Sequence, residues 1–136
     1  MTATFKSVLG RYAEFEGRTG RSAYWTYLLV LGVLFLTLYA LGRTLISLVG
    51  WPPAAVGWLE TVVLVATIPF LLPTLCATVR RLQDSDHMPW WIALGVLGAL
   101  PVLGYVVGVV LLYLLWLPGT AGPNGYGAVP TGEVRV

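Results

Sequence analysis

Basic side chains flank two apolar segments of this chain in a pattern that suits recognition of an anion. Arg18 and Arg21 precede the first apolar segment, and Arg80 with Arg81 directly follow the second. Guanidinium groups bind phosphate and carboxylate oxygens through paired hydrogen bonds. Asp84 follows these two arginines at spacings of four and three, so the three side chains share a face if this stretch is helical. We predict a pocket for an anionic lipid headgroup or phosphate, in which Asp84 holds one guanidinium; alternatively, the arginines only set topology and anchor the surface.

The segment after the second arginine pair also contains groups that could transfer protons. Asp84, Asp86 and His87 would serve an enzyme acting on lipid headgroups if they converged over a cleft. A metal site would need a second His or Cys nearby, and the single cysteine, Cys76, lies in an apolar segment as a packing residue. The sequence has no nucleophile elbow and no phosphate-cradling glycine loop. We therefore predict no catalytic residues, no metal and no cofactor.

Three long apolar segments must position these polar groups. The chain has 136 residues, of which 57% are hydrophobic and 10% charged, which is too apolar for a soluble domain of this size. A helix crosses the hydrocarbon core of a bilayer with about 20 apolar residues. The sequence predicts an all-α membrane protein, a small multi-pass helical bundle that forms one membrane domain over residues 1–130. Its apolar spans are 23–41, 61–79 and 90–117, and a Pro/Gly-rich tail covers 118–136.

The segments around the first two spans have recognisable local patterns. Residues 4–16 alternate apolar and charged side chains at helical spacing, which predicts an amphipathic helix at the membrane interface before the first span. Residues 42–59 contain glycines and the pair Pro52-Pro53, which predicts a turn region. Pro69 and Pro73 each remove a backbone hydrogen bond inside the second span, so we expect that helix to bend.

The last apolar block leaves two paths open. Residues 90–117 would form about 42 Å of continuous helix at about 1.5 Å per residue, which is long for one span and short for two. We favour three spans, with the last one kinked at Pro101; the alternative is four spans, the last two being a short hairpin. Gly104 and Gly108 in this block suit close helix packing, either within the monomer or in a homo-oligomer. The side of the membrane on which the C-terminus lies depends on this choice.

Basic residues near the ends of the spans predict the orientation. Lysine and arginine are concentrated before the first span and in the loop after the second. Such residues mark the cytoplasmic side of a membrane protein. We therefore expect the N-terminus and residues 80–87 on the cytoplasmic side and the turn at Pro52-Pro53 outside.

Three separated motifs carry a resemblance to a known family, and together they cover most of the chain. Taken with their positions relative to the spans, they resemble the bacterial inner-membrane family catalogued as domain of unknown function 805, the YhaH-like proteins. The resemblance implies a small multi-pass protein of the bacterial inner membrane and no established activity, cofactor or substrate. The motifs are Phe15-x-Gly17-Arg18-x-x-Arg21-x-x-Tyr24-Trp25, then Arg80-Arg81-Leu82-x-Asp84 followed by Trp90-Trp91, and a tail motif Pro118-Gly119-x-x-Gly122-x-Asn124-x-Tyr126-Gly127-x-x-Pro130.

These observations favour a protein that acts through interactions. We predict a non-enzymatic inner-membrane protein whose basic cytoplasmic motifs engage anionic membrane lipids or a protein partner; no nucleic-acid partner is expected. One alternative is a small oligomeric transporter or channel gated by the bend of the second span, although no Asp, Glu, Lys, Arg or His lies within residues 22–42 or 61–79. The other alternative is the lipid-headgroup enzyme described above.

Overall fold

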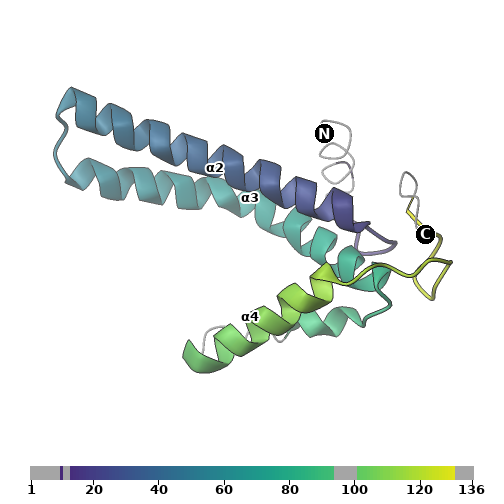
Figure 1. Ribbon diagram of the computed structural model, residues 1–136. Coiled ribbons are helices and arrows are strands. Elements are labelled where there is room, and N and C mark those ends of the chain that lie inside the picture. Colours follow the sequence, from purple (N-terminus) through teal and green to yellow (C-terminus); the bar gives the residue numbers. More distant parts are fainter. Residues whose placement is uncertain (1–9, 11–12, 94–100, 131–136) are drawn as a thin grey trace.

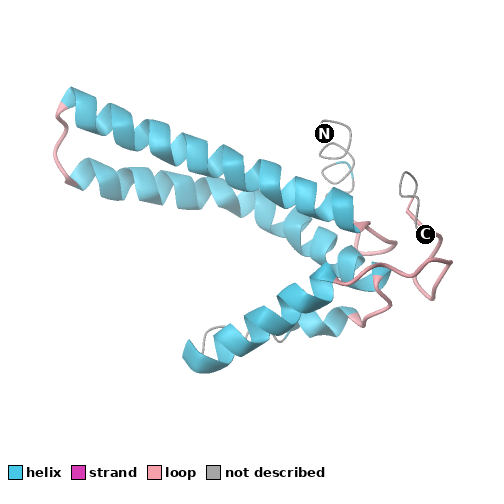
Figure 2. Ribbon diagram, in the orientation of Figure 1, coloured by secondary structure: helices cyan, strands magenta, loops and turns pink. Residues whose placement is uncertain are grey.

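The structure of the chain, a computed structural model, is helical with connecting loops (Figure 1 and Figure 2). It describes residues 10, 13–93 and 101–130. No strand occurs among these residues, and a short 3₁₀ segment covers 89–93. The all-α class expected from the sequence is confirmed. The helices are α2 over Arg21–Val49, α3 over Ala54–Asp84 and α4 over Pro101–Trp116.

Helices α2 and α3 form a long hairpin with a very short connection (Figure 1). Gly50 ends α2 in a left-handed conformation with φ of 71°, and its N–H donates to the carbonyl of Ile46. Glycine favours this cap because it has no Cβ to clash. Pro52 and Pro53 then lead directly into α3. The predicted turn region of residues 42–59 was therefore too wide, because only the residues between Val49 and Ala54 leave the helices.

Both helices of the hairpin are longer than the predicted spans 23–41 and 61–79. At about 1.5 Å per residue, α2 measures about 43 Å and α3 about 46 Å, against a hydrocarbon core of about 30 Å. The most apolar stretch of α2 is 0% buried within the protein, and that of α3 is 17% buried. A core helix of a soluble protein would be mostly covered by its own chain. These two helices are thus apolar enough, long enough and bare enough to cross a membrane.

Two prolines lie inside α3, and the helix continues through both (Figure 1). Pro69 and Pro73 have no N–H to donate, which leaves carbonyls in the preceding turns without their usual partner. Threonine hydroxyls bond to backbone in this region: Thr74 donates to the carbonyl of Phe70 at 2.6 Å. The hydroxyl of Tyr27 on α2 lies 3.1 Å from that of Thr74. This contact ties α2 to α3 in the proline-containing stretch.

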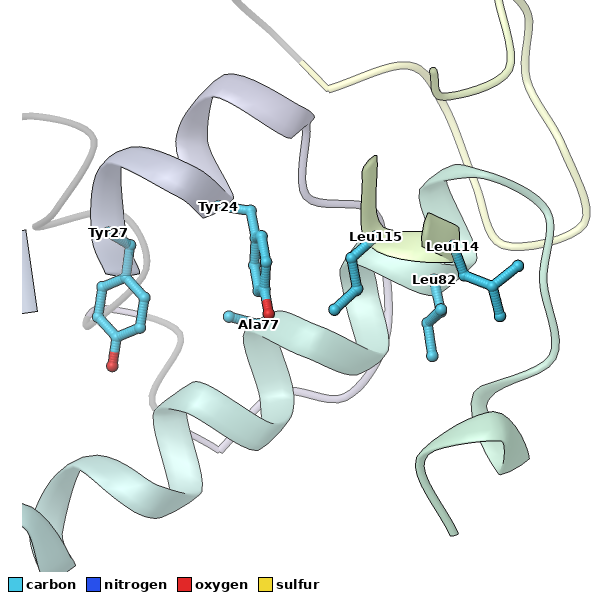
Figure 3. Packing of buried hydrophobic residues seen from close by; sticks show 6 residues of the cluster. All are labelled: Tyr24, Tyr27, Ala77, Leu82, Leu114 and Leu115. Atoms are coloured by element: carbon cyan, nitrogen blue, oxygen red, sulfur yellow. The ribbon is translucent and has the colours of Figure 1, made fainter. Parts of the chain in front are cut away.

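A small buried core lies at the end of the hairpin where α2 begins and α3 ends. It draws side chains from all three helices, as Figure 3 shows. The hydroxyl of Tyr24 in this core lies 3.2 Å from the hydroxyl of Thr78, which adds a second polar link between α2 and α3. The core therefore fixes the end of the molecule that carries the basic motifs. Its buried members are Tyr24, Tyr27, Ala77, Leu82, Leu114 and Leu115.

The two described ends of the last apolar block pack on the same core, which corrects the favoured single span kinked at Pro101. The described part of α4 begins at Pro101. Trp91 and Ile92 at the start of the block pack on the same core as Leu114 and Leu115 near its end. A helix that crossed the membrane once would place these ends on opposite sides. Both described ends of the block instead lie beside the end of α3.

The N-terminal interfacial helix predicted over residues 4–16 falls mainly outside the described residues. Of this range, only residues 10 and 13–16 are described, and residues 13–16 form a turn and a bend. Gly17 lies in a bend with a positive φ of 93° just before Arg18, a conformation that glycine adopts readily. A helix in this region would therefore end before residue 13.

Candidate functional site

The carboxylate of Asp84 lies between two guanidinium groups at the end of α3. Its Oδ1 accepts from Nε of Arg18 at 3.0 Å, and its Oδ2 accepts from Nη1 of Arg81 at 2.8 Å. The side chains of these residues are at most 1% exposed. The pairing of Asp84 with Arg81, predicted from their spacing, is confirmed. We call Arg18, Arg80, Arg81 and Asp84 the Asp84 cluster.

Arg18 uses all five of its N–H donors within the protein. Besides the bond to Asp84 Oδ1, Nη1 donates to the carbonyls of Gly122 at 2.7 Å and Gly127 at 3.3 Å. Nη2 donates to the carbonyls of Thr120 at 2.8 Å and Asp84 at 3.4 Å. A guanidinium has five donors in a fixed planar fork, so Arg18 has none left for a ligand in this arrangement. Its role is to hold the tail against the end of α3.

Arg81 joins α4 to the same carboxylate. Its Nε donates to the carbonyl of Leu115 at 3.1 Å, and its Nη2 donates to the carbonyl of Leu117. The last carbonyls of a helix have no partner within the helix and carry partial negative charge, so a cation there is favourable. Arg81 therefore acts as the cap of α4. This contact holds the end of α4 against the end of α3.

Arg80 is the third buried guanidinium of the Asp84 cluster, with 1% of the residue exposed. Its Nε donates to the carbonyl of Cys76 at 3.3 Å, and its own carbonyl accepts from the backbone N–H of Thr19 at 3.0 Å. Three cations and one carboxylate lie in the cluster, and backbone carbonyls supply the remaining acceptors named above. A buried guanidinium needs acceptors for its N–H groups, and the carbonyl of Cys76 supplies one for Arg80.

The tail motif closes the Asp84 cluster from outside. Asn124 donates from Nδ2 to the carbonyl of Gln83 at 2.8 Å, and its Oδ1 accepts from the backbone N–H of Tyr126 at 3.0 Å. The backbone of Asn124 also exchanges two hydrogen bonds of 3.1 Å with Gly127. The N–H of Thr120 donates to the carbonyl of Asp84 at 2.9 Å. All three sequence motifs thus meet at one end of the hairpin.

This convergence predicts where the two ends of the chain lie in the membrane. Because Arg18 bonds directly to the tail, a reporter fused after residue 136 is expected on the same side as one fused before residue 1. A reporter inserted between Trp51 and Pro52 is expected on the opposite side. Paired fluorescent-protein and alkaline-phosphatase fusions measure this, since the former reports the cytoplasm and the latter the periplasm. Fusions at the two chain ends that report opposite sides would contradict this arrangement.

Arg21 is the predicted site residue that the structure leaves out of the Asp84 cluster. It is exposed on the first turn of α2, and no acidic residue occupies that turn. Trp25, one turn further, packs on Trp116 at the end of α4, with 5.6 Å between ring centroids. A groove of about 470 Å³ opens between these elements. We call it the Arg21 groove, and it is lined by Arg21, Ser22, Trp25, Thr26, Leu29 and Trp116.

The candidate acid and base groups do not converge. Asp84 is buried with both carboxylate oxygens engaged by arginines, whereas Asp86 is exposed. Nδ1 of His87 lies 3.1 Å from the hydroxyl of Ser85, its neighbour in the loop. Among the described residues, no group of three His, Cys, Asp or Glu side chains is placed to hold a metal ion. Within the described part of the chain, Asp84 and Asp86 therefore differ in exposure and do not form the joint acid–base site that the enzyme alternative requires.

The glycines proposed for helix packing lie on α4. A Cβ added to Gly108 would meet no atom of the described chain within 4 Å. Gly108 therefore has open space beside it, which the closest packing between helices of one chain would have filled. Assembly of copies through Gly104 and Gly108 remains a prediction.

The sequence did not predict the backbone carbonyls that accept hydrogen bonds from Arg18, and it did not predict the Arg21 groove. The carbonyls of Thr120, Gly122 and Gly127 have no side-chain signature, so only the Gly/Pro-rich character of the tail hinted at them. The pairing of Trp25 with Trp116 is a contact between α2 and α4, which the local pattern around either residue does not predict.

The fold and the Asp84 cluster define a small, α-helical, multi-pass membrane protein. The chain belongs to the family described as protein of unknown function (DUF805), whose model matches residues 12–128. It is 31% identical over 126 residues to inner membrane protein YhaH of Escherichia coli K12, covering 93% of this chain and 94% of that protein. It is 30% identical over 126 residues to inner membrane protein YhaI of the same strain, covering 93% of each. No solved structure matches.

These comparisons confirm the resemblance carried by the three motifs. Together with the bare apolar helices, they place the chain in the bacterial inner membrane. The family model begins before Arg18 and ends after Gly127, so it contains every residue of the Asp84 cluster and of the tail that closes it.

Proposed function

We propose that this inner-membrane protein is not an enzyme and that it binds anionic lipid headgroups through the basic end formed by the start of α2 and the ends of α3 and α4. The observation that carries the proposal is that the arginines at this end differ in burial and in bonding. Arg18 and Arg81 are buried and bonded to the protein itself, whereas Arg21 is exposed at the same end. A lone exposed guanidinium at a membrane boundary attracts phosphate groups of lipids.

In this proposal the five residues predicted for anion binding have different tasks. Arg18, Arg80, Arg81 and Asp84 hold the two loops and α4 together, and Arg21 contacts the lipid. Positive charge exceeds negative charge in the buried cluster at the same end of the hairpin, which adds to the attraction for an anion. The expected cytoplasmic orientation of this end places it at the leaflet surface that carries anionic lipid.

The buried carboxylate supports a role without catalysis. A general base must be free to accept a proton from a substrate within hydrogen-bond reach. Asp84 has a guanidinium on each carboxylate oxygen and 0% of its side chain exposed. The transporter alternative gains no comparable support, because residues 22–42 and 61–79 have no Asp, Glu, Lys, Arg or His to bind a solute or relay a proton.

Arg21→Gln is expected to reduce retention of phosphatidylglycerol about tenfold, because a hydrogen bond to a charged group contributes about 1.5–3 kcal/mol. Native mass spectrometry of protein released from nanodiscs of mixed phosphatidylglycerol and phosphatidylethanolamine measures this retention. Arg43→Gln is the matched control, since Arg43 is an exposed arginine near the other end of α2. Equal retention by Arg21→Gln and the parent protein would refute the proposal.

A further inference from the structure

We infer that the Arg21 groove binds one anionic phospholipid, with the phosphate at Arg21 and an acyl chain along Leu29 and Trp116. The inference rests on the proposed function and adds a site with a defined shape. The groove lies between the start of α2 and the end of α4, and its volume is about 470 Å³. It thus offers more than a charged surface, because a lipid chain can enter beside the headgroup.

The polarity of the groove changes along its length in the way a phospholipid requires. Arg21 and Ser22 line it at the start of α2, Thr26 follows one turn later, and Leu29 lies a further turn along. From the first to the last of these residues the helix rises about 12 Å at about 1.5 Å per residue. The headgroup region of one leaflet is about 5–7 Å thick, so this distance carries a ligand from headgroup depth into hydrocarbon.

The electrostatics at the polar end select an anion. The first turn of α2 has no acidic residue, and Gly20 before it makes no side-chain cap. The first N–H groups of the helix therefore add partial positive charge next to the Arg21 guanidinium. The helix N–H groups and the Arg21 guanidinium both attract the phosphate of an anionic headgroup. A zwitterionic headgroup also carries an ammonium group, which neither of them attracts.

Two tryptophans form the walls of the groove. Trp25 and Trp116 pack against each other at an angle of 60°, which leaves an aromatic surface suited to the boundary between headgroups and chains. The indole Nε1 of Trp25 is covered and has no hydrogen-bond acceptor among the described residues.

The Asp84 cluster positions both sides of the groove. Arg81 bonds the carbonyls of Leu115 and Leu117, the residues on either side of Trp116. Arg18 fixes the chain three residues before Arg21 through Asp84. The buried cluster is thus a set of positioning residues, and the groove is the surface they hold in place.

Filling the groove tests this inference. Thr26→Trp is expected to reduce phosphatidylglycerol retention about tenfold in native mass spectrometry, although Arg21 is unchanged. Thr37→Trp is the matched control, because Thr37 is exposed on α2 away from the groove, and it should retain lipid within about twofold of the parent protein. Retention by Thr26→Trp equal to that of the control would overturn the groove as the binding site.

A second measurement applies even if the filled variant does not fold. A photoreactive benzoylphenylalanine in place of Thr26 is expected to form adducts enriched in phosphatidylglycerol over the composition of the nanodisc. The same group in place of Thr37 should report the bulk composition. Adducts at residue 26 with the bulk composition would overturn the groove even where Arg21→Gln loses lipid, and the proposed function would then stand alone. If Arg21→Gln loses no lipid, the proposed function fails and this inference with it.

Discussion

Asp84→Asn is expected to lower the free energy of unfolding by about 3–5 kcal/mol, the usual cost of removing one partner from a buried charge pair. The amide is nearly the same size as the carboxylate, so packing is conserved and charge is lost. Its NH₂ group would face one of the two guanidinium groups, donor against donor. Both guanidiniums would stay buried without the negative charge that each now contacts. Denaturant titration of the protein in mild detergent measures the loss.

Asp86→Asn is the control for this substitution. Asp86 lies two residues further along, is exposed, and has a left-handed backbone with φ of 59°. Asparagine accepts that conformation as readily as aspartate does, so the change should stay within about 0.5 kcal/mol of the parent protein. If the two variants lost stability equally, Asp84 would not be the centre of the cluster.

The long elements of the fold were predictable because each depends on a local pattern. Apolar segments without charge gave the two long helices, and the glycine and proline residues between them marked the turn. The predicted spans were too short and the predicted turn was too long. Gly42 and Gly57 lie inside helices, whose hydrogen bonds continue across them. At Gly42 the missing side chain has a packing role, since a Cβ there would lie 2.6 Å from Cδ1 of Leu59. A glycine by itself does not reveal which of these roles it has.

The path of the last apolar block could not be read from its own residues. Proline at position 101 is compatible with a kink inside a helix and with the first residue of a new one. The choice is made by Arg81, which lies far away in the chain and caps the end of α4. A contact of this kind is tertiary, so periodicity within the block carries no signal of it.

The sequence predicted which residues belong to the candidate site better than it predicted how they contact one another. Spacing along one helix was enough to pair Arg81 with Asp84. The bond between Arg18 and Asp84 joins residues in two different motifs, and three of the other acceptors of Arg18 are backbone carbonyls of the tail. Any residue type supplies a carbonyl, so the sequence cannot show which arginines are buried and bonded inside the protein and which are exposed.

Arg18→Lys tests whether the guanidinium fork, beyond its charge, holds the tail in place. Lysine keeps the positive charge but offers three donors from one nitrogen, and these cannot reach acceptors in Asp84, Thr120, Gly122 and Gly127 at once. Losing several charge-assisted bonds is expected to cost about 3 kcal/mol. The tail should then open about a hundredfold more often. Hydrogen–deuterium exchange at the amide of Thr120, which donates to the carbonyl of Asp84, measures the opening.

Arg21→Lys provides the comparison, because it makes the same change three residues away at an exposed site. It should leave exchange of the Thr120 amide unaltered and keep most of the attraction for anionic lipid. Arg18→Lys should instead speed exchange of the Thr120 amide. It should also weaken lipid retention indirectly, since the chain before Arg21 would no longer be fixed. Exchange at Thr120 that did not respond to Arg18→Lys would mean that the tail is held by Asn124 and the Asp84 carbonyl alone. The buried arginine would then be needed only to neutralise Asp84.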